Sequence, residues 1–221
     1  MITVHHLNNS RSQRILWLLE ELGLDYQVKC YQRDPQTMLA PATLRAIHPL
    51  GKSPVVTDDN MTLAESGAII EYLVERYGQG KLSPAAGTSE YLRYKYWLHY
   101  AEGSLMPPLL LNLTFSELVK RSMFLVRPIV WIISQSIKSS YITPQIMLHL
   151  NYLESELAGK DWFVGSDFTA ADIQMSFPLE TAAERASLDA SQPKLIAFLQ
   201  RIHARPAYDR ALERGRGNII N

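Results

Sequence analysis

The sequence contains a single cysteine, Cys30, among its 221 residues. One cysteine excludes an internal disulfide framework, and it also excludes a Cys-x-x-Cys redox pair. Such a chain fits a reducing compartment, and we expect a cytoplasmic protein. Residues 1–5 lack a basic segment followed by an apolar core, so no secretory signal is expected.

The chain also lacks net charge, because 22 Lys and Arg residues balance 22 Asp and Glu residues. This balance gives no electrostatic reason to expect a nucleic-acid partner. The six histidines are scattered without the spacing of metal ligands, so no metal is expected.

Long hydrophobic runs are missing, although 47% of the residues are hydrophobic. The most apolar stretch, residues 123–133, is too short to span a bilayer and contains Arg127 and Pro128. We expect no stable membrane insertion, and we interpret this stretch as a buried helix or as the wall of a ligand pocket, with membrane contact as a minor alternative.

Residues 1–78 predict a small sheet with helices packed on it. Apolar residues at helical spacing predict one helix that ends before Gly23 and another that follows Ser66. An irregular helix is expected to end before His48. Strands are expected at residues 3–5, 26–31, 54–56 and 61–63. The order β-α-β-α-β-β-α is the thioredoxin-like arrangement.

Residues 79–89 are rich in Gly, Pro and Ser and predict a linker to a second domain. Residues 90–221 show apolar positions at helical spacing and predict an all-helical domain, so the fold class is two-domain α+β. We expect a helix broken at Met106-Pro107-Pro108 and a last short helix from Pro206. Helices are also expected around residues 122–139, 144–157 and 195–202. The basic residues near the C-terminus, including Arg205 and Arg210, are interpreted as a solvated helix face.

Thr169-Ala170-Ala171-Asp172 predicts a helix start within the second domain. Asp172 can reach back to Thr169 as in a capping box, with Phe168 and Ile173 in the positions of a hydrophobic staple. We interpret Asp172 as a folding residue.

The most informative stretch is His48-Pro-Leu-Gly-Lys-Ser-Pro-Val-Val56, followed by Glu65-Ser66. An X-Pro bond has only a small trans preference, so Pro54 can be cis, which would turn the backbone of Ser53 outward. Ser66 begins an amphipathic helix, whose free N–H groups attract a carboxylate. Together with the cation of Lys52, these groups would suit a small zwitterionic peptide.

These two motifs resemble the glutathione-binding half of the cytosolic glutathione transferases. The resemblance implies that Pro54 is cis, that Ser53 pairs its backbone with the cysteinyl part of glutathione, and that Glu65 and Ser66 hold the γ-glutamyl end. Lys52 is then expected to contact the glycyl carboxylate, with Arg11 beside it in the glutathione site. The family also implies glutathione as the co-substrate, a role in detoxification, and a homodimer with each site completed near the subunit interface.

Glutathione transfer needs a thiolate, whereas a free thiol has a pKa of about 8.5. Asn9, Ser10 and Ser12 stand where the first strand ends and offer donors that can stabilise the anion. In serine-type transferases the activating Ser stands four residues before an Arg, a spacing that Ser10 and Arg14 share, so Ser10 is the expected donor. Ser10-x-x-Gln13 is also a capping box, and the structural alternative stays open.

Two departures from the common pattern keep the donor assignment open. Arg11-Ser12 replaces the proline-containing turn that often follows the catalytic serine, and no Tyr stands near the end of the first strand. Ser12, Arg11 or the amide of Asn9 can therefore share the role. The segment from Ser10 to Leu22 resembles a fungal and bacterial branch of the family. We interpret Arg14 as structural, either paired with Glu65 or Glu71 or packed across the domain boundary.

The second substrate, an apolar electrophile, is expected to lie against the helical domain. The candidate contacts are Tyr100, Ser104, Met106, Pro107 and Leu111, with Trp131 from the next helix. An aromatic and methionine stripe at helical spacing is also typical of plain core.

The function that the sequence predicts is that of a glutathione S-transferase, which activates glutathione as a thiolate for attack on apolar electrophiles. A glutathione-dependent peroxidase or disulfide reductase is one alternative, because two glutathione molecules can supply both thiols. A non-catalytic protein that binds glutathione or a hydrophobic compound is the other.

Overall fold

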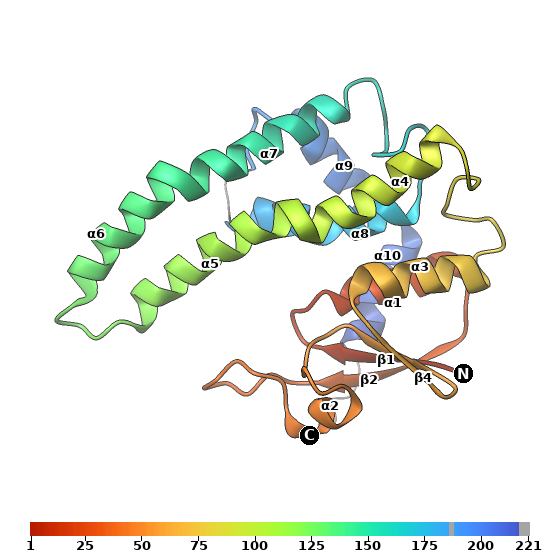
Figure 1. The fold of residues 1–221 in the computed structure, drawn as a ribbon, viewed down its shortest axis with the longest axis horizontal. Helices are drawn as coiled ribbons and strands as arrows, with labels where there is room; N and C mark the ends of the chain where they lie inside the picture. The colour runs from red at the N-terminus through yellow and green to blue at the C-terminus, as the bar shows by residue number, and fades with distance from the viewer. Residues whose placement is uncertain (186–187, 217–221) are drawn as a thin grey trace.

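The computed structural model describes residues 1–185 and 188–216. Its first part has the predicted order β-α-β-α-β-β-α and is thioredoxin-like (Figure 1). Its elements are β1 (Ile2–Leu7), α1 (Ser12–Leu22), β2 (Tyr26–Tyr31), α2 (Ala42–Ile47), β3 (Val55–Asp58), β4 (Met61–Ala64) and α3 (Ser66–Tyr77).

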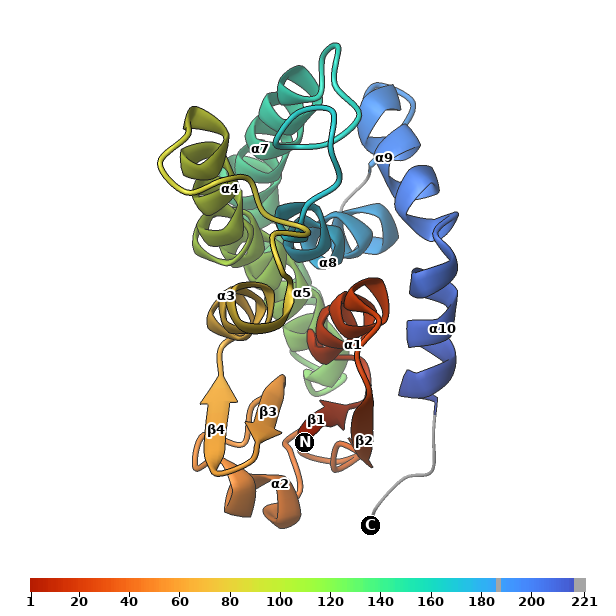
Figure 2. The same ribbon diagram turned by 90° about the vertical axis from the view of Figure 1, so that its right-hand side faces the viewer.

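The four strands form one mixed sheet in the order β2-β1-β3-β4. β1 runs parallel to β2 and antiparallel to β3, and β3 and β4 pair as an antiparallel hairpin. Figure 2 shows α1 and α3 on one side of this sheet and α2 on the other. Every residue of β1 is buried because the strand has neighbours on both edges and helices on both faces.

The second part is helical throughout the residues that the structure describes, as predicted. It contains α4 (Ser89–Tyr100), η1 (Ala101–Leu105), α5 (Met106–Arg121), α6 (Arg127–Ile137), η2 (Lys138–Ile142), α7 (Thr143–Glu156), α8 (Ala170–Arg185), α9 (Pro193–His203) and α10 (Pro206–Gly215). The expected break at residues 106–108 is wrong. Pro107 and Pro108 lie in the first turn of α5, where a proline removes no helical hydrogen bond, and the π-helical η1 joins α5 to α4.

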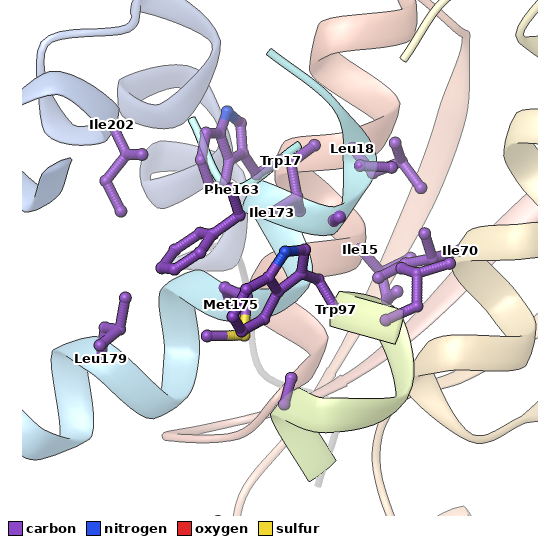
Figure 3. Packing of buried hydrophobic residues seen from close by; sticks show 14 of the residues in the cluster. Ile15, Trp17, Leu18, Ile70, Trp97, Phe163, Ile173, Met175, Leu179 and Ile202 are labelled. Atoms are coloured by element: carbon purple, nitrogen blue, oxygen red, sulfur yellow. The ribbon is translucent and has the colours of Figure 1, made fainter. Parts of the chain in front are cut away.

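One hydrophobic core joins the two parts of the chain. Ile15, Trp17 and Leu18 of α1 belong to the same cluster as Trp97 of α4 and Phe163 (Figure 3). Trp17 and Trp97 are fully buried, and a buried aromatic ring removes a large apolar area from water. The helical part therefore completes the core that the sheet and its helices begin.

The last helix, α10, returns to pack beside α1 and β2 (Figure 2). Arg205 donates two hydrogen bonds to the carboxylate of Glu21, at 2.5 and 2.8 Å, and Arg210 donates to Glu20 at 2.7 Å. The ring of Tyr208 meets Trp17 edge to face. The interpretation of the C-terminal basic residues as a solvated face is wrong for Arg205 and Arg210, which tie the end of the chain to its first helix.

Asp172 holds the start of α8 as the sequence predicted. Its carboxylate accepts hydrogen bonds from the backbone N–H groups of Thr169 and Phe163, at 2.8 and 2.9 Å. The Thr169 hydroxyl also donates to it at 3.0 Å. Asp172 thus fastens both the helix start and the preceding loop from a fully buried position.

The apolar stretch at residues 123–133 is not buried, and the interpretation of a buried helix is wrong. It forms the loop between α5 and α6 and the first part of α6, which extend together beyond the rest of the helical part (Figure 1). Its apolar side chains are exposed because the hairpin of α5 and α6 extends farther than the helices that would cover it.

We predict that Asp172→Asn abolishes one component of the pH dependence of stability. Burial raises the pKa of Asp172 to about 6. Because the pKa in the folded protein exceeds the ordinary value near 3.8, the native state binds more protons than the unfolded state between pH 4 and 6. The stabilising contribution of this carboxyl to folding is therefore lost as the pH rises through that window. The free energy of unfolding of the wild type minus that of Asp172→Asn should fall by about 3 kcal/mol from pH 4 to 6.5 in urea titrations. A difference that stays constant across this range would contradict the prediction.

Candidate functional site

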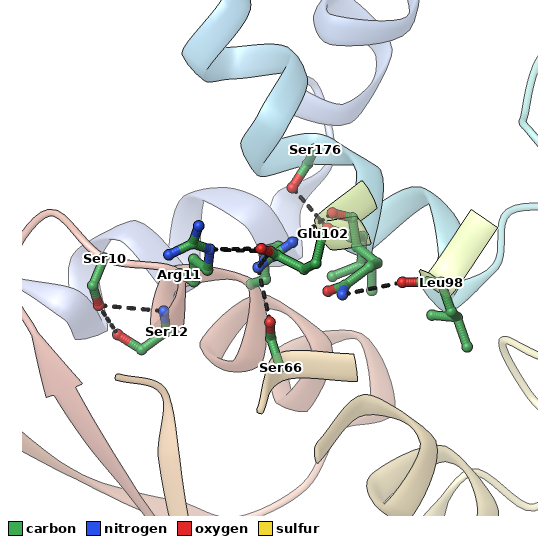
Figure 4. Close-up of polar contacts among 10 residues, drawn as sticks. Ser10, Arg11, Ser12, Ser66, Leu98, Glu102 and Ser176 are labelled. Carbon is green, nitrogen blue, oxygen red and sulfur yellow. Dashed lines mark hydrogen bonds and ion pairs between the residues drawn. The ribbon is translucent and has the colours of Figure 1, made fainter. Parts of the chain in front are cut away.

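Ser10 lies in the loop between β1 and α1, inside a chain of hydroxyl groups (Figure 4). Its Oγ is 2.7 Å from the Oγ of Ser12 and donates to the Oγ of Ser53 at 3.2 Å. The Oγ of Ser12 lies 2.8 Å from Nδ1 of His6. Ser10 retains 7% of its accessible surface, whereas Ser12 has none. Of the two serines of this loop, Ser10 is therefore the one that meets solvent, beside the half-buried Ser53.

The proton of Ser10 is donated to an acceptor that a ligand can replace. The hydroxyl of Ser53 donates to the carbonyl of His5 at 3.1 Å and accepts from the N–H of Leu7 at 3.3 Å. Ser53 is thus an acceptor for Ser10 and has no proton to offer it. A ligand atom that replaces Ser53 as the acceptor can take the hydrogen bond that Ser10 now makes to it.

The predicted capping box at Ser10 is not formed. The helix begins at Ser12, and the side chain of its N-cap residue, Arg11, caps no N–H group. A capping box would need the Oε1 atom of Gln13 at the N–H of Ser10, but this oxygen lies beside Gly215 of α10, and Nε2 is buried without a hydrogen-bond partner. The backbone group that the Ser10 side chain accepts from is the N–H of Ser12, at 3.4 Å.

The Ser53–Pro54 peptide bond is cis, as the resemblance implied. β3 begins at the next residue, with Val55 in register with His5 of β1. Ser53 consequently lies at the end of the sheet beside Ser10, while Lys52 is exposed.

Glu65 and Ser66 mark the start of α3. Glu65 has a φ of 70°, a left-handed conformation that is strained for a residue with a Cβ and recurs at functional sites. Its side chain is exposed, and Ser66 is buried. The first N–H groups of this 12-residue helix point out of its N-terminus, where they favour an anion.

Arg14 connects this helix start to the helical part of the chain. Its guanidinium is buried and donates to the Oγ of Ser66 at 2.9 Å and to the backbone oxygen of Gln174 at 2.7 Å. Its charge is balanced by Glu102 of η1, with N and O atoms 2.5 Å apart. The structural interpretation of Arg14 is supported, but its acidic partner is Glu102 rather than Glu65 or Glu71.

Glu102 also binds Arg11, whose Nε lies 3.0 Å from the carboxylate (Figure 4). Arg11 and Arg14 both stand over the ring of Phe177 in α8, 5.6 and 5.3 Å from its centre. No sequence pattern predicted a role for Glu102 or Phe177. Their positions depend on how α1 packs against the helical part, which no local spacing reveals.

Two further residues of the site, His6 and Gln174, were not predicted from the sequence. His6 lies near the end of β1, two residues before the turn at Asn8, and this place is the signal that could have identified it among the scattered histidines. Burial lowers the pKa of His6 to about 4, so the ring is neutral at pH 7. Gln174, whose carbonyl receives Arg14, has an ordinary position in α8 and carries no signal that could have found it.

The remaining donor candidate, Asn9, has a φ of 51° and an exposed side chain. Its left-handed backbone makes the turn that separates β1 from α1, a conformation that asparagine tolerates better than most residues. Asn9 is next to Ser10 in the chain, but the hydroxyl chain is built from Ser10, Ser12 and Ser53.

The residues predicted to contact the second substrate do not all lie in one place. The hydroxyl of Tyr100 lies 2.5 Å from Nδ1 of His149, and its ring packs among aromatic rings of α4 and α7. Met106 belongs to the buried core, whereas Pro107 and Leu111 are exposed and Ser104 is half-buried. These four follow Glu102 along η1 and α5.

Trp131 is separate from this group. It lies on α6, at an open groove on the outer side of the helical hairpin that is also lined by Gln135, Lys138, Ser139, Thr143, Pro144 and Met147. Among the residues that the structure describes, there is no group of three His, Cys, Asp or Glu side chains that could hold a metal ion.

The comparison with protein families agrees with this geometry. Residues 1–75 match the model of the glutathione S-transferase N-terminal domain, and residues 121–206 match that of the glutathione S-transferase C-terminal domain. The chain belongs to the glutathione S-transferase family. The resemblance that the proline motif and the Glu-Ser pair suggested is thereby confirmed.

Individual relatives extend the glutathione S-transferase match over the whole chain. Glutathione S-transferase 3 of Schizosaccharomyces pombe is 39% identical over 100% of this chain and 90% of its own length. The crystal structure of a glutathione S-transferase from Actinobacillus pleuropneumoniae is 37% identical, with a TM-score of 0.81 over 99% of this chain and 94% of that one. A relative from Escherichia coli, the disulfide-bond oxidoreductase YfcG, is 28% identical over 96% of this chain and 94% of its own.

We predict that Glu102→Gln destabilises this protein by about 2 kcal/mol, because it leaves the buried guanidinium of Arg14 without its balancing charge. Urea denaturation would measure the loss. The matched control is Glu71→Gln, which removes the partner of Lys95 from a partly exposed ion pair of 2.7 Å and should cost no more than about 0.5 kcal/mol. Equal losses in the two variants would show that the Arg14–Glu102 pair has no special weight.

Proposed function

We propose that this transferase binds glutathione, stabilises its thiolate, and directs the sulfur at an electrophilic centre of an apolar compound. The thiol proton leaves to solvent, a bond forms between sulfur and carbon, and the electron pair of the bond that breaks departs with the leaving group. The observation that supports this most strongly is the hydroxyl of Ser10, which keeps some contact with solvent and donates to Ser53, an acceptor that the sulfur can replace.

The proposed role of Ser66 is to donate to the γ-glutamyl carboxylate. Because Ser66 Oγ accepts a hydrogen bond from Arg14, its own proton is free for a ligand. The guanidinium behind it adds a positive charge with little water nearby, and the helix N-terminus adds a favourable dipole. Glu65, at the strained position before Ser66, would receive the amino group at the same end of glutathione.

The remaining peptide contacts follow from the same orientation. Ser53, before the cis proline, would pair its backbone with the cysteinyl residue, which brings the sulfur toward Ser10. Lys52 is exposed and would neutralise the glycyl carboxylate, with Arg11 beside the site. A bound tripeptide would then have both of its charged ends matched.

Ser10 is the proposed sulfur donor, and Ser12 acts through it. Ser12 is fully buried and spans the gap between Ser10 and His6, so it lacks access to a ligand. If Nδ1 of His6 carries the proton, it donates to Ser12, and Ser12 donates to Ser10. The proton of Ser10 is then directed outward to the sulfur.

The apolar substrate is proposed to lie beside Ser10 against η1 and α5. Pro107 and Leu111 offer exposed apolar surface there, with Ser104 between them and Glu102. Met106 and Tyr100 would support this wall from the core rather than touch the substrate. We also propose a cytoplasmic homodimer with a role in detoxification, and a domain division at residues 1–78, 79–89 and 90–221.

A disulfide reductase is the second candidate function. The relative from Escherichia coli carries the name of a disulfide-bond oxidoreductase at 28% identity. With one cysteine in the whole chain, such a reaction would take both thiols from two glutathione molecules. The first thiolate would attack the substrate disulfide, forming a mixed disulfide and releasing one substrate thiolate. The second would attack the glutathione sulfur of that mixed disulfide, releasing oxidised glutathione and the other substrate thiolate.

We predict that Ser10→Ala raises the pKa of enzyme-bound glutathione by about one to two units, the value of a hydrogen bond to a charged group. The measurement is an ultraviolet titration of thiolate absorbance in the wild type and the variant. Conjugation at neutral pH should fall in parallel. Asn9→Ala is the control and should leave the bound thiol pKa unchanged.

The same titration separates the proposals. A low thiol pKa that survives Ser10→Ala but not Asn9→Ala would move the donor to Asn9. A normal thiol pKa in a wild type that still reduces mixed disulfides would favour the second candidate function. A normal pKa without either activity would leave a glutathione-binding protein.

We predict that His6→Leu raises the bound thiol pKa by about half a unit, because Ser12 and Ser10 lose their orientation. His6→Asn is the matched variant, since its side-chain nitrogen is attached to Cγ as Nδ1 is and can donate to Ser12. Both variants vacate the volume of the ring and should lower the melting temperature alike. Only His6→Asn should keep the low thiol pKa, and equal pKa values in both variants would contradict the role of His6.

A further inference from the structure

The hairpin tip, which we define as residues 118–133, carries the most exposed apolar group of side chains described in this chain. Met123, Phe124 and Leu125, in the loop between α5 and α6, are 74%, 81% and 79% exposed. The other exposed apolar residues of the tip are Leu118, Val126, Ile129, Trp131, Ile132 and Ile133. Contiguous apolar surface of this kind in a folded protein marks an interaction site.

The exposure is not confined to one side of α6. Trp131, Ile132 and Ile133 are consecutive, so they point in different directions around the helix, and all three are exposed. The buried residue of α6 is a polar one, Ser134. An apolar helix with solvent around it indicates that the tip enters an apolar phase rather than docking one face against a flat protein surface.

The charge around the tip has one predominant sign. Lys120, Arg121, Arg127 and Lys138 are basic, and Glu117 is the single acidic residue between positions 103 and 153. Because the whole chain is neutral, this positive charge is offset elsewhere in the molecule.

The contacts of the basic side chains neutralise only part of this charge and leave the rest exposed to solvent. Lys120 lies 2.8 Å and Arg121 lies 3.8 Å from the carboxylate of Glu117, so two cations share one anion, and both side chains are mostly exposed. Arg127 donates to the backbone oxygens of Ser122 and Lys120, at 3.1 and 3.4 Å, and holds the loop in place without a balancing charge in these contacts. The tip is thus an apolar loop within a ring of cations.

We infer that the hairpin tip docks on the surface of a bilayer that carries anionic headgroups. Phe124 and its neighbours would enter the boundary between headgroups and acyl chains, Trp131 would lie at the interface, and the basic ring would meet the anionic headgroups. No helix among the described residues is long and apolar enough to cross a membrane, so the contact is a reversible one at the surface.

The same charges disfavour a second copy of the chain as the occupant of the tip. A two-fold contact between tips would place this patch against an identical patch, so the cations of Lys120, Arg121 and Arg127 on one copy would lie near those on the other. Like charges in such a contact repel, whereas anionic headgroups attract them. The inference uses neither Ser10 nor glutathione, and it stands or falls apart from the proposed function.

The experiment measures binding of the full chain to two kinds of vesicle. One consists of phosphatidylcholine alone, and the other also contains about 30% phosphatidylserine, which makes its surface anionic. Trp131 is the natural reporter, because it is 52% exposed while Trp17, Trp97 and Trp162 are buried. We expect co-sedimentation with the anionic vesicles, a blue shift of Trp131 emission, and its quenching by brominated acyl chains. High salt should weaken the binding.

Two variants change the tip, and one serves as control. Phe124→Ser with Leu125→Ser should lower the partition coefficient about tenfold or more, and Lys120→Gln with Arg121→Gln should lower it at least about fivefold on anionic vesicles. Leu92→Ser, which removes an equally exposed apolar side chain from α4, should change nothing. Circular dichroism and conjugation activity would verify that each variant is folded.

Three results would overturn the inference. The first is a lack of binding to anionic vesicles, and the second is binding that survives both tip variants. The third is a wild type that sediments as a dimer, does not bind vesicles, and becomes a monomer in the Phe124→Ser, Leu125→Ser variant. That last result would assign the tip to a second copy of the chain.

Discussion

The buried charge of Arg14 is the constraint on which the rest of this structure depends. A guanidinium removed from water is costly unless acceptors and an opposite charge surround it. Here the acceptors come from three segments far apart in sequence, namely the hydroxyl of Ser66, the carbonyl of Gln174 and the carboxylate of Glu102. The arginine therefore requires α1, α3, η1 and α8 to meet in one arrangement, and the shared apolar core supplies the free energy that holds them there.

The candidate site inherits its geometry from this junction. Ser66 is fixed by Arg14 from behind, and Ser10 is fixed by Ser12 and Ser53 from the side. Each hydroxyl accepts a hydrogen bond from the protein. Ser66 can then donate to a ligand, and Ser10 can do so by exchanging Ser53 for the ligand as its acceptor. Two donors of this kind, held by rigid elements, can recognise the two ends of an extended peptide without reorganising, and preorganised donors are the most effective at stabilising an anion.

The sequence predicted what local patterns encode. The strand and helix order of the first part and the reach of Asp172 follow from residues within a few positions of one another. The local sequence allowed a cis bond at Pro54, and the family resemblance implied it. Glu102, Gln174 and the Glu21 partner of Arg205 could not be predicted, because each is chosen by packing between distant segments. The apolar stretch at residues 123–133 was misjudged for a related reason. Hydrophobic periodicity identifies a helix but does not say whether the body of the molecule is long enough to cover it.

The position of α10 bears on how the chain folds as it is made. The helix that packs beside α1 and the outer strand β2 consists of residues 206–215, which are synthesised long after the sheet. A nascent chain that has completed the sheet therefore still lacks the partners of Trp17, Glu20 and Glu21. Although domains generally fold in the order of their synthesis, the first part of this chain can reach its final packing only after residues 206–215 have left the ribosome. A premature stop near residue 200 would then affect the N-terminal sheet, some 180 residues away in sequence, as directly as the helices beside it.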